Sequence, residues 1–372
     1  MITLLGRDPD PNFLVHTPFS RLSAHHRQVG RGAAGADAVD HPELYYGIPG
    51  TTGPATRGRL GVVTQVTLPG PTSLRFNRRV LPTDPQRTIT RNPGTTSASI
   101  PEAGLITRVP GAGPFPPETA SIADTNLYLY PENGAFFDVG NLLYQARLLT
   151  ENRASICRRY GLSKLDTGDG SDGMGTGSGV SKIRIPSSIA RYNEWVNLAP
   201  IRHCLSCAAT RKGAPPELQV LNASNIWPAY GKDVALAGES QGDLPLGTRC
   251  VIRWQDRGLI DSLGLTPRGK LLFTCLLHYG FYIMSGNSEY DAVNNGASLQ
   301  FAIDNAPTSN GQWPTDARAE FVDQMLRLIP HCWPVRSFRP LDQETEVWTN
   351  GLAYASGGSA LYPDAACRAW DY

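Results

Sequence analysis

The loop from Trp227 to Asp233 brings two aromatic rings, an amine and a carboxylate close together in the chain. A tyrosine beside a lysine can take a proton from a sugar, and the face of an indole can stack on a sugar ring. With His203 and Asp138 from other segments, Tyr230 and Lys232 form the candidate catalytic set. A surface turn around a half-buried tryptophan is the commoner outcome for any one residue of such a loop.

Candidate substrate-binding residues accompany this set. We expect Trp227 and Tyr128 to offer aromatic faces, and Arg27 or Lys232 to stabilise a substrate carboxylate. His26 belongs to an adjacent pair, His25-His26, whose side chains point in opposite directions on an extended chain. Both therefore cannot easily hold one metal, and docking of the surrounding segment is their default role.

The segment 166–179 is the most biased in composition, with glycines between carboxylates at three-residue spacing. Asp166, Asp169 and Asp172 could fold around a hard cation such as calcium. Their spacing is not that of an EF-hand, and a surface loop or a tight turn is the commoner explanation of such a segment. We expect no cofactor, unless calcium binds here.

The motif His203-Cys204-Leu-Ser-Cys207 suggests zinc or redox chemistry. A structural zinc site needs a second pair of ligands, and no other Cys-x-x-Cys or His-x-x-x-His is present. We therefore expect buried cysteines and a core histidine. The chain has seven cysteines, so at least one cannot pair within it.

Charge and motifs exclude several functions. A net charge of +1, with only 18% charged residues, gives no broad basic field for nucleic acid. No apolar run is long enough for a bilayer, and no signal peptide is visible at the N-terminus. There is no Gly-x-Ser-x-Gly elbow and no His-Glu-x-x-His pair.

The elements that must position these residues are mostly strands. Thirty-eight glycines and thirty prolines disfavour long helices and favour short strands joined by turns. We predict one hairpin from residues 60–68 and 74–81. A second joins residues 126–130 to 135–139 through an Asn-Gly turn. Further strands are expected at 219–221, 249–254 and 280–284.

Few helices are expected. Thr266 and Pro267 predict a helix that ends near residue 279, and an apolar stripe predicts another over 316–329. A weaker signal covers 188–198. Residues 1–60 read as an extended arm that lies on its own domain or on a neighbouring subunit. The fold class is thus mainly β: a β-sandwich or jelly roll over residues 61–372, with decorating helices.

A recurring order of short motifs spans about residues 120–290. It includes Gly177-Ser-Gly179, His203, Trp227-Pro-Ala229, Leu265-Thr-Pro267 and Tyr279-Gly-Phe-Tyr282. This order resembles a set of uncharacterised, mostly secreted bacterial proteins that are similar to jelly-roll proteins acting on polysaccharides. That set often has a histidine just after the Pro-Ala pair, where this chain has Gly231 and Lys232, and it usually begins with an export signal.

Two hypotheses follow. In the first, an extracellular or surface-exposed protein binds or cleaves polysaccharide as a lyase or glycoside hydrolase of jelly-roll type. In the second, a non-enzymatic structural protein, such as a virion or surface-layer component, assembles as a homo-oligomer through the N-terminal arm. Whether the protein is an enzyme is left open at this stage, and membrane insertion is not expected.

Overall fold

The fold is that of a computed structural model. It describes residues 46–49, 51, 54–69, 188–226, 229, 240–304 and 313–335, and the backbone of nine further strands between residues 75 and 362. These described parts are mostly strand with few helices, as the composition predicts.

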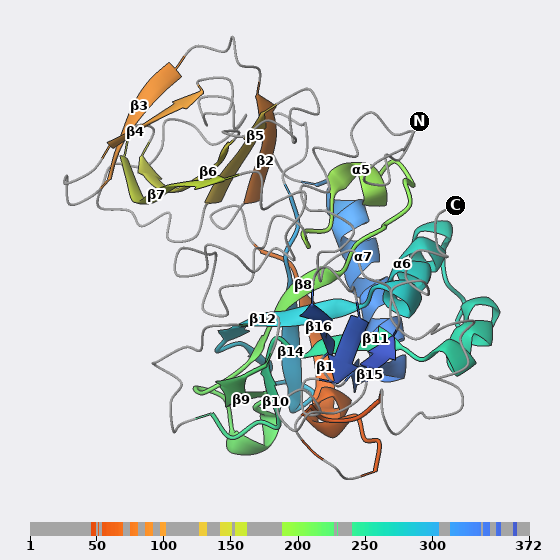
Figure 1. The fold of residues 1–372 in the computed structure, drawn as a ribbon. Coiled ribbons are helices and arrows are strands. Elements are labelled where there is room, and N and C mark those ends of the chain that lie inside the picture. Colours follow the sequence, from red (N-terminus) through yellow and green to blue (C-terminus); the bar gives the residue numbers. More distant parts are fainter. Residues whose placement is uncertain are drawn as a thin grey trace.

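A seven-stranded mixed sheet forms the centre of the described core (Figure 1). Its order is β1-β14-β8-β12-β11-β15, with the short β13 paired to β14. β1 and β14 run parallel, as do β8 and β12, and the other neighbours are antiparallel. The strands are β1 (Val63–Thr67), β8 (Leu205–Thr210), β11 (Arg249–Ile252), β12 (Phe281–Asn287), β13 (Tyr290–Asp291), β14 (Gly296–Phe301) and β15 (Cys332–Val335).

In the inner strands, the side chains on both faces of the sheet are buried. All four residues of β11 are buried, and so are five of the six in β8 and in β14. Such strands read as continuous apolar runs because both faces of the sheet are covered. α6 (Pro267–His278) packs against β11, and α7 (Thr315–Leu328) packs against β1 and α6.

Local signals explain both long helices. The Thr266 hydroxyl accepts the amide N–H of Gly269, and Pro267 occupies the first helical position, so the predicted start of α6 is confirmed. A Cβ on Gly269 would collide with the Gln324 side chain of α7, so glycine allows the two helices to approach. α7 starts at Thr315 as predicted, and its last turn passes into the 3-10 helix η11 (Ile329–His331).

The weaker helix signal over 188–198 is only partly right. A single turn, α5 (Tyr192–Trp195), forms there. The indole N–H of Trp195 donates to the carbonyl oxygen of Ala317 at 2.8 Å. The Trp195 ring packs edge-on against that of Phe321, with 5.0 Å between the ring centroids. These two contacts fix the turn to α7, and the helix does not extend beyond it.

A six-stranded mixed sheet curls into an open, half-barrel-like shape (Figure 1), in the order β2-β5-β6-β7-β3-β4. Two smaller sheets pair β9 with β10 and β16 with β17 and β18. The strands are β2 (Arg75–Val80), β3 (Gln86–Arg91), β4 (Ser97–Pro101), β5 (Asn126–Pro131), β6 (Leu142–Thr150), β7 (Arg153–Gly161), β9 (Leu221–Asn225), β10 (Leu244–Leu246), β16 (Phe338–Asp342), β17 (Val347–Asn350) and β18 (Ala360–Tyr362).

The predicted hairpin of 60–68 with 74–81 is wrong. β1 pairs in parallel with β14, and β2 pairs in parallel with β5 in a different sheet. The predicted partner of the second hairpin, residues 135–139, lies outside the described part of the chain. β5 pairs antiparallel with β6, with Tyr128 opposite Gln145. Strands predicted near 219–221, 249–254 and 280–284 correspond to β9, β11 and β12, with shifted ends.

The described residues between 46 and 60, which belong to the predicted N-terminal arm, pack against the central sheet. Tyr46 is 1% exposed and bridges to Val335 of β15, while the Gly47 amide donates to the Pro334 carbonyl oxygen at 2.8 Å. Leu60, in the 3-10 helix η2 (Gly58–Val62), is completely buried. Within the described ranges, no helix has the length and apolarity needed to cross a membrane.

Candidate functional site

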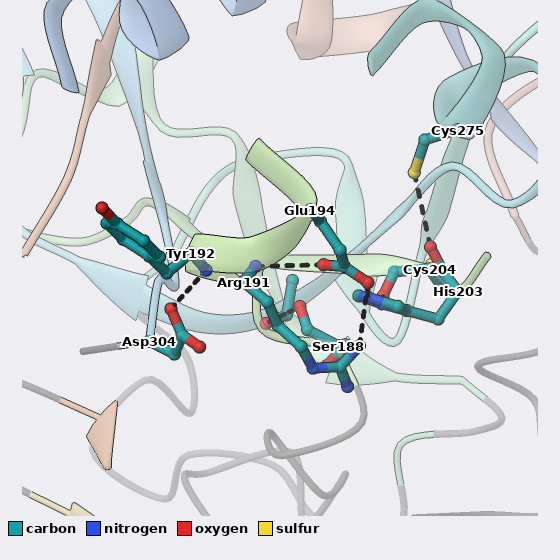
Figure 2. A network of polar contacts seen from close by, with 9 residues as sticks. Ser188, Arg191, Tyr192, Glu194, His203, Cys204, Cys275 and Asp304 are labelled. Atoms are coloured by element: carbon teal, nitrogen blue, oxygen red, sulfur yellow. Dashed lines mark hydrogen bonds and ion pairs between the residues drawn. The ribbon is translucent and has the colours of Figure 1, made fainter. Parts of the chain in front are cut away.

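A buried polar network surrounds the one predicted catalytic residue whose side chain is described, His203 (Figure 2). The carboxylate of Glu194 is its centre. Oε1 of Glu194 lies 3.0 Å from Nη1 of Arg191 and 2.9 Å from Nε2 of His203, and its Oε2 accepts the backbone N–H of Arg191. Arg191 and His203 are both 0% exposed.

The partners of His203 fix where its protons lie. Nδ1 of the ring is 2.9 Å from the carbonyl oxygen of Cys204, which can only accept, so Nδ1 carries a hydrogen. Nε2 faces the Glu194 carboxyl at hydrogen-bonding distance, so a second proton is shared between these two groups. The Arg191 guanidinium and the His203 ring thus flank one buried carboxyl group.

Asp304 is a second buried carboxyl beside this network. Its Oδ1 accepts the backbone N–H of Tyr192 at 2.7 Å and the indole N–H of Trp313 at 3.2 Å. Burial raises the pKa of Asp304 to about 7, against the opposing effects of the Tyr192 hydrogen bond and the Arg191 charge. Asp304 therefore changes charge in the neutral range.

The network joins α5, α6 and β8 rather than opening to solvent. Cys275 of α6 donates its S–H to the carbonyl oxygen of His203 at 3.3 Å, and the Ser206 hydroxyl of β8 donates to the Ser188 carbonyl oxygen at 3.1 Å. The Asp304 amide donates to the carbonyl oxygen of Ala190. In this arrangement His203 has no surface on which a polymer could lie, and its geometry is that of a residue that positions its neighbours.

Five buried cysteines share the same core, and all five are free thiols. Burial raises the pKa of Cys204 and of Cys332 to about 12, and it raises the pKa of the others well above the ordinary value. Since the thiolate is the nucleophile, these thiols are unreactive in the folded protein. The expectation of buried cysteines and a core histidine is confirmed for Cys204, Cys207 and His203. The five are Cys204, Cys207, Cys250, Cys275 and Cys332.

A second arrangement lies beside β15, where each of two tryptophan rings has an arginine guanidinium over it. The guanidinium carbon of Arg253 lies 4.2 Å from the ring centroid of Trp333. The same guanidinium contacts the Asp256 carboxylate at 2.7 and 3.2 Å. The side chains of Arg253 and Asp256 are 25% and 22% exposed, so the pair meets solvent.

The 3-10 helix η10 (Trp254–Asp261) continues this surface. The guanidinium carbon of the exposed Arg257 lies 5.5 Å from the ring centroid of the half-buried Trp254. The backbone N–H of Trp254 lies 3.4 Å from the Tyr46 hydroxyl, and its indole is 5.7 Å from the ring of His278. These contacts hold the indole at one orientation.

We call Arg57, Arg253, Trp254, Asp256, Arg257 and Trp333 the tryptophan–arginine face. Arg57 donates to the carbonyl oxygens of Cys332 and Ile329, at 2.9 and 2.8 Å, which ties it to the start of β15. Burial lowers the pKa of His331, the Asp256 charge opposes this effect and the Arg57 charge adds to it, so both charges act at His331.

Most predicted site residues lie outside the described part of the chain. This holds for the catalytic candidates Tyr230, Lys232 and Asp138, for the binding candidates Trp227, Arg27 and His26, and for the aspartates Asp166, Asp169 and Asp172. Tyr128 is described only as a backbone position in β5. Among the side chains that are described, no three metal-ligating groups converge on one point.

The tryptophan–arginine face is absent from the sequence-based candidates. A local signal exists, because Arg253, Trp254, Asp256 and Arg257 fall within one short segment. Trp333 could not be added from the sequence, since only the pairing of β11 with β15 brings it beside Arg253. Comparisons with protein-family models, with curated proteins and with solved structures found no match for this chain.

Proposed function

We propose that this protein binds polysaccharide through the tryptophan–arginine face. The observation that carries the proposal is the pair of half-buried indoles, Trp254 and Trp333, each with an arginine guanidinium over its ring, in η10 and in β15, the outermost strand of the central sheet. Indole faces cover the apolar side of a sugar ring, and neighbouring arginine and carboxylate groups can hydrogen-bond its hydroxyls.

Preorganisation favours binding at this face. The ion pair of Arg253 with Asp256 and the contact of Trp254 with His278 hold the side chains in place before a ligand arrives. Each immobilised long side chain costs about 0.5–1.5 kcal/mol when it is ordered on binding, and this cost is largely met here in the free protein.

Binding is proposed for this face, and cleavage is not assigned to it. His203 is completely buried, and its two ring nitrogens are engaged by Cys204 and Glu194. A general base must reach the proton that it removes, either directly or through one water. Cleavage by His203, Tyr230, Lys232 and Asp138 stays a prediction, as do the jelly-roll architecture and an extracellular location.

Affinity electrophoresis in gels that contain a panel of neutral and acidic polysaccharides tests the proposal. We expect retardation of the wild type by at least one polymer, and loss of about 90% of that affinity in Trp254→Ala. Tyr290→Ala is the matched control. Tyr290 is 37% exposed on β13, and β15 lies four strands beyond its partner β14, or about 19 Å away.

Incubation of the same polymers with the protein, followed by assays for unsaturated products and for new reducing ends, addresses cleavage. Products that disappear in His203→Gln but persist in Trp254→Ala would place chemistry at the buried network. Unchanged mobility of the wild type with every polymer would refute the binding proposal.

Assembly is the second candidate, and the composition of the same face favours it. Tryptophan, tyrosine and arginine dominate the energetics of protein–protein interfaces, and Trp333 lies on an edge strand. Light scattering of the wild type and of Trp333→Ala separates the two functions. A wild-type oligomer that dissociates in the variant supports assembly, and a monomer in both counts against it.

A further inference from the structure

The tryptophan–arginine face carries more positive charge than the chain as a whole. Three arginines, Arg57, Arg253 and Arg257, stand against one aspartate, Asp256, which leaves an excess of two positive charges. The net charge of the entire chain is only +1. The excess is therefore a local property of this face.

Two of these three arginines have no carboxylate partner among the described residues. Arg253 pairs with Asp256, whereas the hydrogen bonds of Arg57 go to two backbone carbonyl oxygens and that of Arg257 goes to the carbonyl oxygen of Trp254. Burial lowers the pKa of Arg57, as expected for a cation that has lost water without gaining an anion.

We infer that the ligand of this face is an anionic polysaccharide built from uronic acids, in which each sugar ring carries a carboxylate. The inference rests on the proposed function. The ring would lie against Trp254 or Trp333, and its carboxylate would meet the guanidinium of Arg257 or Arg57. A guanidinium presents N–H donors in a planar fork that matches the two oxygens of a carboxylate.

Each indole has a guanidinium in contact with its ring, with the guanidinium carbon 4.2 Å from the ring centroid at Trp333 and 5.5 Å at Trp254. A sugar that contacts the rest of such an indole would therefore meet the cation beside it. A neutral polymer would use the indoles alone and leave these two arginines without a carboxylate partner. An acidic polymer uses both kinds of group at once.

The experiment compares each acidic polymer with its own carboxyl-reduced form, so that linkage and length stay the same and only charge changes. Homogalacturonan, alginate and hyaluronan are the probes, and dissociation constants are measured by titration calorimetry at low and at high salt. We expect at least tenfold tighter binding of one acidic form at low salt, and a clear weakening at high salt.

Arg257→Gln should lower the affinity for the acidic form about fivefold or more and leave that for the reduced form unchanged. Arg268→Gln is the matched control. Arg268 pairs with Glu320 at 27% and 23% exposure, close to the values for Arg253 and Asp256. It lies at the opposite end of α6 from His278, about 15 Å along the helix.

The outcomes separate this inference from the proposed function. Equal binding of acidic and reduced forms, or binding of neutral glycans only, overturns the uronate inference and leaves glycan binding intact. No binding to any glycan overturns both. Equally tight binding of single-stranded DNA, or an Arg257→Gln variant that binds the acid form as wild type does, also overturns the inference.

Discussion

Replacing Asp304 by asparagine removes one buried titratable carboxyl and keeps an oxygen that can accept the N–H groups of Tyr192 and Trp313. In the folded protein the pKa of Asp304 is about 7, against 3.8 for the ordinary group. The folded state therefore binds this proton more tightly than the unfolded state does. Its contribution to stability is complete below about pH 4 and is lost as the pH rises through about 7.

The size of the effect follows from the two pKa values. At about 1.36 kcal/mol for each pKa unit, the difference between 3.8 and about 7 corresponds to about 4 kcal/mol. The free energy of unfolding of the wild type, relative to that of Asp304→Asn, should thus fall by about this amount between pH 4 and pH 8.

Urea unfolding at half-unit pH steps, followed by tryptophan fluorescence, measures both proteins under the same conditions. Asp323→Asn is the control with the opposite sign. The hydrogen bonds from Arg327 lower the pKa of Asp323, so its small contribution is present at neutral pH and is lost on acidification. Parallel pH curves for the wild type and Asp304→Asn would refute the account of a carboxyl whose charge is penalised by burial.

Three further predictions concern the core. His203→Ala leaves the buried Glu194 carboxyl without one hydrogen-bond partner and should cost about 3 kcal/mol in urea unfolding, whereas an effect near zero would contradict the buried network. Gly280→Ala should lower the free energy of unfolding by about 2 kcal/mol or more, because φ of Gly280 is +71° and a Cβ would lie 2.2 Å from the Cys250 carbonyl oxygen. Gly61→Ala should cost little, since a Cβ there meets no atom within 4 Å. Equal losses of stability in the two variants would contradict this reason. Iodoacetamide should modify the five buried thiols only after unfolding, as read by peptide mass spectrometry, whereas rapid labelling of the native protein would show that the core opens. These thiols are Cys204, Cys207, Cys250, Cys275 and Cys332.

Local signals were sufficient for the helices and not for the strand pairing. Thr266 and Pro267 determine the cap and first turn of α6, and the apolar stripe of α7 lies within one continuous segment. β1, by contrast, pairs with β14, whose residues lie more than 200 positions later in the chain. A parallel partner needs a distant strand, and no turn motif near β1 could reveal it.

The candidate site shows the same division. His203 attracted attention as a titratable residue, but its burial depends on Glu194, on α6 and on the start of β8, which only the fold brings together. Trp333 became part of a surface through the pairing of β15 with β11. The residue types in the sequence predicted which functional groups are present. The tertiary contacts determine which of these groups are buried and which face solvent.

The most direct test of polysaccharide binding at the tryptophan–arginine face is the affinity of one responsive polymer for the wild type, Trp254→Ala and Tyr290→Ala. All three must melt at closely similar temperatures for the comparison to hold. The account predicts that Trp254→Ala loses about 90% of the affinity and that Tyr290→Ala keeps it. Equal affinity of all three proteins for the polymer would contradict it.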